Sequence, residues 1–276
     1  MPDNNSNTPI LIERTDGEII NAHHRKPKTD ENSTPVLIIM LHGFPKNQKA
    51  GNNFYGLLAE TYADIGFSTL QFDFIGCEGN NAETQSFSLS SAAQDMQTVI
   101  SWAEQEGYKH LAFIAEGLGS AILFANLPKL ARFCVLCWPA LDLPRLRDEQ
   151  FQAEQHATQT ETDGFLTYNG LKIGRDILDE LKDYDLISDL HKAHAPTLIL
   201  QGEKDTVITS EHLDIVREHL MAPRVDITTF DDGEHGLIKS NHRKACLHLI
   251  QDFSRRHTKY LPDPEENEEE KRQESA

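Results

Sequence analysis

Five stretches of the chain carry groups that could do acid–base chemistry, and each of them directly follows an apolar run. They are His42-Gly43-Phe44, Asp73–Gly79, Glu116–Gly119, Asp205 and His235. A histidine oriented by an aspartate can act as a general base, and backbone N–H groups can stabilise an oxyanion. Because reactive groups of parallel sheets gather at the carboxyl ends of strands, we expect these stretches to meet at one sheet edge.

The third of these stretches predicts a sharp turn from a strand into a helix. The apolar run Leu111–Ala115 passes at once into an Ala-rich helical pattern. Small residues are needed two positions before and two positions after the centre of such a turn, because the backbones of strand and helix pass close together. Ala115 and Gly119 meet this need. The centre is Gly117, which has no side chain and cannot form an acyl-enzyme.

The hydrophobic pattern predicts the elements that would position these groups. Strands are expected over residues 10–14, 19–22, 35–41, 68–73, 111–115, 133–138, 197–201 and 225–230, and helices over 53–65, 89–103, 119–125, 210–220 and 246–253. Strands that alternate with helices indicate an α/β protein with a mostly parallel, doubly wound sheet and helices on both faces. An Asp-Gly turn at Asp16 predicts a hairpin between the first two strands.

We expect one domain over residues 1–261. Within it, residues 142–190 are polar, acidic and helical in places, with no strong strand pattern, which indicates a small cap insertion. Residues 262–276 are mostly Glu and polar, which predicts an acidic, disordered tail.

The composition narrows the range of partners. A formal net charge of -18 argues against nucleic acid and anionic membranes, since both need a basic surface. No run is long and apolar enough to span a bilayer, and Met1–Thr8 lacks the apolar core of a signal peptide, so we expect a cytoplasmic protein. Cys134 and Cys137 have CxxC spacing, but they lie in an apolar strand pattern and are interpreted as core residues. We expect no metal ion and no cofactor.

In their order and spacing, the motifs resemble the α/β-hydrolase superfamily over nearly the whole chain. The closest likeness is to small serine esterases of the feruloyl-esterase and serine-aminopeptidase-like type. The matching stretches are His42-Gly43-Phe44 for the HGF motif, Phe72–Gly76 for the DFRG loop, Ala115–Gly119 for GxSxG, Tyr168–Gly174 for the return from the cap, Gly202–Asp205 for GxxD and Gly233–His235 for the histidine loop.

The resemblance implies a role for each matching residue. Asp205 would orient His235, which would be the general base, and the amides of Phe44 and Leu118 would form the oxyanion hole. The resemblance implies a protein of the carboxylic-ester hydrolase type. Its ligand would be a small ester or acyl compound, and Gly117 would leave little or no acyl-enzyme catalysis.

The chain departs from the family pattern at Gly117 and in the loop after Asp73. Ile75, Cys77 and Glu78 stand where Arg, His and Gly are usual. Three interpretations follow: a natural pseudoenzyme kept for binding or interaction, an active serine esterase with an engineered Ser-to-Gly change, or weak catalysis by a water molecule in place of the serine. The additional departures favour natural loss.

Three nearby residues are poor substitutes for the missing serine. Ser120 lies one helical turn past the centre of the turn and is expected to point into packing. Nothing in the sequence brings Cys77 to His235. Glu116 follows the strand directly, but carboxylate nucleophiles of this superfamily occupy the position of Gly117.

Overall fold

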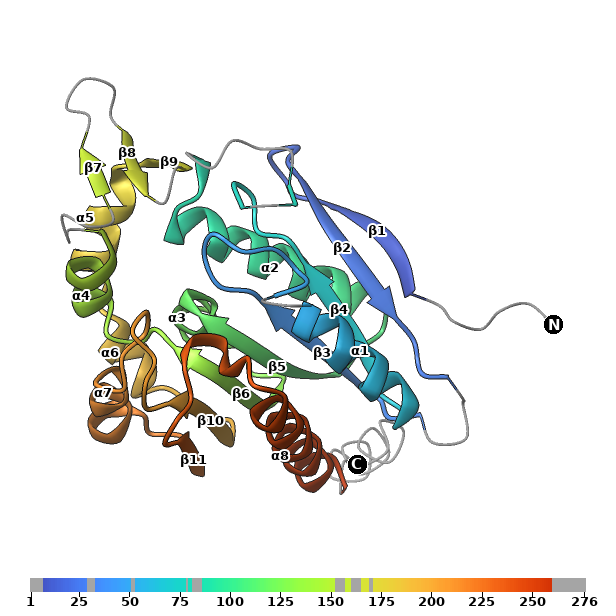
Figure 1. The fold of residues 1–276 in the computed structure, drawn as a ribbon. Helices are drawn as coiled ribbons and strands as arrows, with labels where there is room; N and C mark the ends of the chain where they lie inside the picture. The colour runs from blue at the N-terminus through green and yellow to red at the C-terminus, as the bar shows by residue number, and fades with distance from the viewer. Residues whose placement is uncertain are drawn as a thin grey trace, which may run out of the picture.

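The computed structural model describes residues 7–28, 33–50, 53–77, 79–80, 86–151, 157–159, 165–168 and 171–259. An eight-stranded sheet runs through this part of the chain in the order β1-β2-β4-β3-β5-β6-β10-β11 (Figure 1). Its strands are β1 (Asn7–Glu13), β2 (Ile19–Arg25), β3 (Val36–Leu41), β4 (Ser68–Phe72), β5 (His110–Gly117), β6 (Ala131–Pro139), β10 (Thr197–Gly202) and β11 (Val225–Phe230).

The sheet is parallel from β4 to β11, and β1 and β2 add an antiparallel hairpin at one edge. This confirms the mostly parallel sheet and the predicted hairpin. The chain runs from β3 outward to β4 and then crosses back to β5 on the other side of β3. The direction of winding therefore reverses between β3 and β5. In open α/β sheets, ligands bind outside the carboxyl ends of strands at such a switch point.

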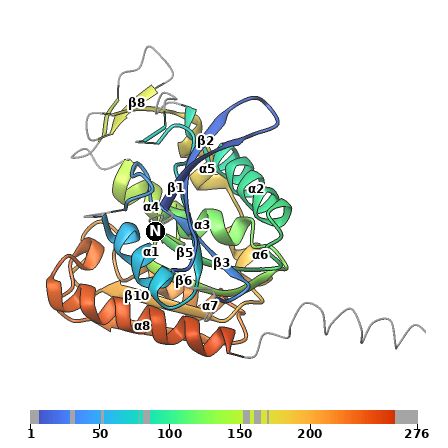
Figure 2. The same cartoon turned by 90° about the vertical axis from the view of Figure 1, so that its right-hand side faces the viewer.

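Helices cover both faces of the sheet (Figures 1 and 2). The helices of the main fold are α1 (Phe54–Asp64), α2 (Leu89–Gln105), α3 (Leu118–Ala125), α6 (Leu186–Leu190), α7 (His212–His219) and α8 (Ser240–Thr258). Residues of α1 and α8 pack into one hydrophobic cluster, and residues of α2, α3, α6 and α7 pack into the other. α7 lies inside the predicted range 210–220, and Glu211 is its N-cap residue.

The two core clusters explain the cysteines. All four cysteines are free and buried. Cys134 belongs to the cluster on one face of the sheet and Cys137 to the cluster on the other, as expected for strand residues three apart. Their interpretation as core residues is confirmed.

The insertion between β6 and β10 holds more regular structure than the sequence indicated. It contains α4 (Leu143–Leu146), a π-helical turn η3 (Arg147–Phe151), α5 (Asp176–Asp183) and the strands β7 (Ala157–Gln159), β8 (Phe165–Tyr168) and β9 (Leu171–Gly174). The three strands form a separate antiparallel sheet, which Figure 1 shows beside α5. Residues 142–190 show no strong strand pattern in the sequence, because strands of three or four residues are too short to show alternation.

The remaining expectations concern the chain ends and membranes. The acidic tail predicted for residues 262–276 lies outside the described residues. Within the described ranges, no helix combines the length and the apolar character needed to cross a bilayer.

Candidate active site

Gly117 forms the sharp turn that the sequence predicted. β5 ends at this residue and α3 begins at Leu118. Gly117 has φ 51° and ψ -126°, a backbone conformation that L-residues with a side chain rarely adopt. A Cβ atom built on Gly119 would lie 2.6 Å from the carbonyl oxygen of His42 and 2.9 Å from that of Leu41. Only glycine fits at Gly119, because the start of α3 passes so close to the end of β3.

The space above Gly117 is open. A Cβ atom built on Gly117 would meet a single atom within 4 Å, the Cα of Gly43, at an ordinary contact distance of 3.7 Å. The surroundings therefore leave room for a small side chain at this position. Only its backbone conformation favours glycine.

Asp205 and His235 lie side by side although 30 residues separate them. Asp205 follows β10, and His235 opens a short 3-10 turn, η4 (His235–Leu237), after β11. Nδ1 of His235 lies 2.9 Å and 3.1 Å from the two carboxylate oxygens of Asp205. Since a carboxylate only accepts, Nδ1 carries the proton, and Nε2 of the neutral ring is left as the basic nitrogen.

The backbone holds the Asp205 carboxylate in place. Its Oδ1 accepts hydrogen bonds from the N–H groups of Val207 and Ile208, each at 2.8 Å. The side chain of Asp205 is fully buried, whereas 35% of the His235 side chain remains exposed. A rigid, buried acid therefore orients a histidine that solvent and a ligand can reach.

Gly117 and His235 line the same small cavity, of about 60 Å³. Phe44 and Leu118, whose backbone N–H groups are the predicted oxyanion donors, also line this cavity. Leu118 is the first residue of α3, where N–H groups have no acceptor within the helix. The other lining residues are Gly43, Lys46, Glu116, Trp138, Leu146, Gln150, Val207 and Ile208. The structure thus brings together all five residues that the sequence analysis selected for the site.

His42 fixes the loop that carries Phe44. The N–H of Phe74 donates to its Nε2 at 3.1 Å, so Nδ1 carries the proton and donates to the carbonyl of Gly43 at 2.9 Å. Burial lowers the pKa of His42 to about 4, which keeps the ring neutral. His42 therefore ties the loop after β3 to the loop after β4 and does no proton transfer in this arrangement.

Glu116 and Trp138 are among the lining residues to which the sequence analysis gave no role in the site. Glu116 is buried, and its Oε1 accepts a hydrogen bond of 3.4 Å from the N–H of Gly43. Burial raises the pKa of this carboxyl group, whereas the hydrogen bond from Gly43 and the positive charges of Lys46 and Arg243 lower it. Trp138 packs its ring edge against His235 with ring centres 6.1 Å apart and has a positive φ of 39°. The carboxyl-end rule would have found Trp138, since it lies at the end of β6 next to β5.

Two of the three substitute nucleophiles considered from the sequence, Ser120 and Cys77, are buried away from the cavity. Ser120 is a residue of α3 with a buried side chain, and its hydroxyl has no hydrogen-bond partner in the described part of the chain. Cys77 packs in the core, where burial raises its pKa well above the ordinary value. Neither lines the cavity at Gly117. Among the described residues, no three His, Cys, Asp or Glu side chains are placed to hold a metal ion together.

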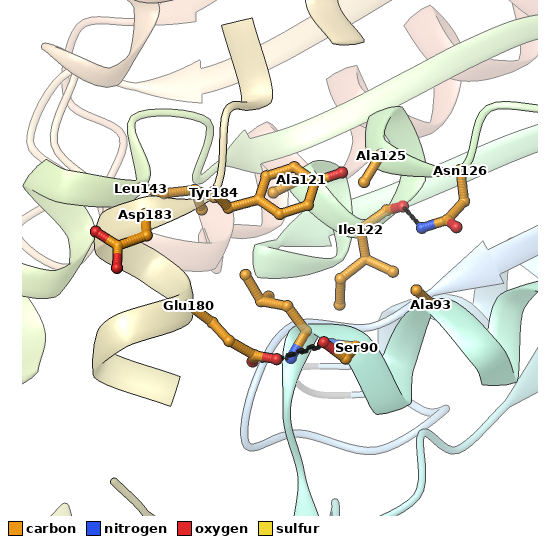
Figure 3. A pocket seen from close by; sticks show the side chains of 11 residues that line it. Ser90, Ala93, Ala121, Ile122, Ala125, Asn126, Leu143, Glu180, Asp183 and Tyr184 are labelled. Atoms are coloured by element: carbon orange, nitrogen blue, oxygen red, sulfur yellow. Dashed lines mark hydrogen bonds between the residues drawn. The ribbon is translucent and has the colours of Figure 1, made fainter. Parts of the chain in front are cut away.

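A larger cavity, of about 350 Å³, lies between α2, α3, α4 and α5 (Figure 3). It shares no lining residue with the cavity at Gly117. We therefore place the candidate chemistry in the smaller cavity, which holds the Asp205–His235 pair.

Comparison with known proteins agrees with this fold. A family model described as acyl transferase matches residues 9–178. Est1E of Butyrivibrio proteoclasticus, solved with ferulic acid bound, is 16% identical and aligns over 91% of this chain and 100% of its own, with a TM-score of 0.78. The esterase domain of a Rhodothermus marinus protein is 16% identical over 91% of this chain and 98% of its own, with a TM-score of 0.69. The Pyrococcus furiosus esterase Pf2001 is 15% identical over 91% and 92%, with a TM-score of 0.69.

No curated protein matches the sequence. The solved structures share the fold, which confirms the α/β-hydrolase architecture. The family model spans more than half of the 276 residues. The chain therefore belongs to the acyl transferase family and has the α/β-hydrolase fold.

Proposed function

We propose that this protein is of the carboxylic-ester hydrolase type and that His235 activates a water molecule, rather than a serine, for attack on the ester. The observation that carries the proposal is the open space above Gly117, which faces the same cavity as His235. A cavity of about 60 Å³ has room for a water molecule in that space. The ligand would be a small ester or acyl compound.

The proposed reaction has two steps. The water oxygen attacks the acyl carbon while its proton passes to Nε2 of His235, and Asp205 stabilises the resulting imidazolium. The amides of Phe44 and Leu118 would hold the oxyanion of the tetrahedral intermediate. His235 then returns the proton to the leaving alkoxide, so that acid and alcohol are released without an acyl-enzyme.

The expected rate is low. Serine hydrolases stripped of triad members keep roughly 10³–10⁴-fold acceleration over water, from the oxyanion hole and binding alone. The insertion over residues 142–190 would act as a cap that selects the ligand, since Leu146 and Gln150 line the cavity. The proposed location is cytoplasmic.

One observation favours binding without turnover as a second candidate function. The buried Glu116 carboxyl lies against the N–H of Gly43, next to the proposed oxyanion donor Phe44. When ionised, it would oppose a developing oxyanion. A natural pseudoenzyme that binds an acyl compound is therefore the alternative that the experiment must separate.

The test is steady-state hydrolysis of p-nitrophenyl butyrate by the wild-type chain and by His235→Ala. Because 13 histidines could each attack this activated ester, His248→Ala serves as the matched control on the exposed face of α8. Loss of rate in His235→Ala alone supports the proposal. Equal rates in all three proteins would contradict the proposal and favour the pseudoenzyme that binds an acyl compound without turnover.

A further inference from the structure

The larger cavity between α2, α3, α4 and α5 has the volume of a small-molecule site, about 350 Å³ (Figure 3). Ala93 of α2 and Ala121 and Ala125 of α3 line it, and these short side chains leave the space between the two helices unfilled. Ile122 and Leu143 add further apolar surface. The interior of the larger cavity is therefore suited to the apolar body of a ligand.

Carboxylates stand at the end of the larger cavity that α5 forms. The carboxylate of Glu180 accepts hydrogen bonds from the N–H of Leu89 at 2.6 Å and from the hydroxyl of Ser90 at 2.6 Å, which fix it against the first turn of α2 (Figure 3). Neither donor is charged. Asp183 is the exposed last residue of α5 and also lines the cavity. A negative side chain at the C-terminus of a helix is unfavourable, because the last carbonyl groups already carry partial negative charge.

Tyr184 adds an aromatic ring beside these carboxylates. It directly follows Asp183, lines the larger cavity and donates its hydroxyl to Oδ2 of Asp189 at 2.9 Å. Burial, this hydrogen bond and the negative charges of Asp189 and Asp185 raise the pKa of Tyr184 to about 12, so the ring stays neutral. The face of a neutral phenol ring attracts cations.

The lining of the larger cavity selects the charge of a ligand. Among the described residues that line it, none is a lysine, arginine or histidine. Lys182 lies in the last turn of α5 but does not belong to the lining. The carboxylates would repel an anion. A cation would offset their charge and contact the ring of Tyr184.

We propose that the larger cavity binds an organic monocation, an ammonium group on an apolar body. The ammonium group lies between Glu180, Asp183 and the ring of Tyr184, and the apolar body lies against the alanines of α2 and α3. This site is independent of the chemistry at Gly117, since the two cavities share no lining residue.

The experiment compares hexylammonium, hexan-1-ol and hexanoate, which share one apolar body and differ in charge. Nuclear magnetic resonance titration follows the methyl signals of a chain labelled with ¹³C-alanine, so each affinity is measured at a known place. The signals of Ala93, Ala121 and Ala125 should shift, whereas that of Ala59, in the core cluster on the other face of the sheet, should not.

Hexylammonium should bind about tenfold more tightly than hexan-1-ol, the combined order of an exposed ion pair and a cation–π contact, and hexanoate should bind most weakly. Added salt should reduce the preference for hexylammonium, because screening weakens attraction between exposed charges.

Two sets of variants test the charge and the space. Glu180→Gln combined with Asp183→Asn should bring the affinity for hexylammonium down to that for hexan-1-ol, since glutamine still accepts hydrogen bonds from α2 but carries no charge. Asp179→Asn, on α5 outside the lining, is the matched control. Ala93→Phe should weaken both compounds by filling the cavity, whereas Gln94→Phe, at the neighbouring exposed position of α2, should follow the wild type.

Two results would overturn the proposal: equal affinities for the three compounds in the wild type, or a preference for hexylammonium that persists in the double variant. Melting temperatures show whether each variant is folded. If the double variant is not, Asp183→Asn alone and the effect of salt decide. His235→Ala should abolish the proposed hydrolysis and leave the binding of hexylammonium unchanged, so the two proposals can fail separately.

Discussion

The carboxyl group of Glu116 accepts a hydrogen bond from the N–H of Gly43 across the floor of the candidate site, at 3.4 Å. This contact joins the end of β5 to the loop after β3, the two strands between which the winding of the sheet reverses. The loop and the strand pass close together here, because a Cβ atom on Gly43 would lie 3.3 Å from the backbone carbonyl oxygen of Glu116. A buried acid is thus part of the candidate site, next to Gly117.

Glu116→Gln should make the protein more stable at about pH 8 and no more stable near pH 4. Burial raises the pKa of Glu116 in the folded state above its ordinary value of 4.5, so the folded chain binds this proton more tightly than the unfolded chain. The contribution is favourable at low pH and is lost as the pH rises from the unfolded towards the folded pKa. Glutamine keeps an acceptor for Gly43 and carries no charge.

Melting temperatures across the pH range check this prediction, with the exposed Glu60→Gln on α1 as control. A melting temperature below that of the wild type at about pH 8 would contradict it.

Gly119→Ala should destabilise the protein more than Gly117→Ala or Gly107→Ala. Added Cβ atoms at Gly117 and Gly107 meet no close atom, so the cost in these variants is the backbone strain of a residue with a side chain at positive φ. At Gly119 the Cβ would lie 2.6 Å from the carbonyl of His42, and the backbone must move. Such overpacking costs about 1–3 kcal/mol or more. Chemical denaturation measures the three values, and an equal loss in all of them would refute the close approach of α3 to β3.

Gly117→Ser should lower the free energy of unfolding modestly, by about 1–3 kcal/mol, whatever it does to activity. The serine fits the open space but must adopt φ 51°, a conformation that glycine adopts freely. Differential scanning calorimetry provides the test. A higher melting temperature for Gly117→Ser would show that the turn is not strained.

Asp205→Asn should remove the hydrogen bond that orients His235 and preserve the conformation of the loop that follows β10. Asparagine can still accept hydrogen bonds from Val207 and Ile208, but its amide nitrogen cannot accept one from Nδ1 of His235. We expect a melting temperature close to that of the wild type, and loss of the hydrolysis that depends on His235. Asp205→Ala, which removes both sets of hydrogen bonds, should lose stability as well. Equal melting temperatures for the two variants would show that the loop does not depend on Asp205.

The Asp205–His235 pair could be predicted because each residue directly follows a strand with a clear apolar pattern. The order of such strands in a doubly wound sheet then brings their carboxyl ends together. Gly119 was identified for a similar reason, since the close passage of strand and helix restricts side-chain size locally. The positive φ of Gly117 follows from the same local turn.

Other features depend on contacts that sequence patterns do not encode. Glu116 comes to lie in the cavity because β5 packs beside the loop of Gly43. The short strands β7, β8 and β9 pair with each other and not with the main sheet. The larger cavity arises where alanines of α2 and α3 meet, and β5 separates these two helices in the sequence.

The central claim is that the candidate site lacks only the hydroxyl group of its nucleophile. Stopped-flow hydrolysis of p-nitrophenyl butyrate by the wild-type chain, by Gly117→Ser and by Gly117→Ser combined with His235→Ala tests it most directly. The account predicts slow release without a burst in the wild type, a burst of one equivalent and a large rate gain in Gly117→Ser, and loss of that gain in the double variant. A Gly117→Ser protein that stays inert on a panel of short and long acyl esters would contradict the claim and leave a pseudoenzyme.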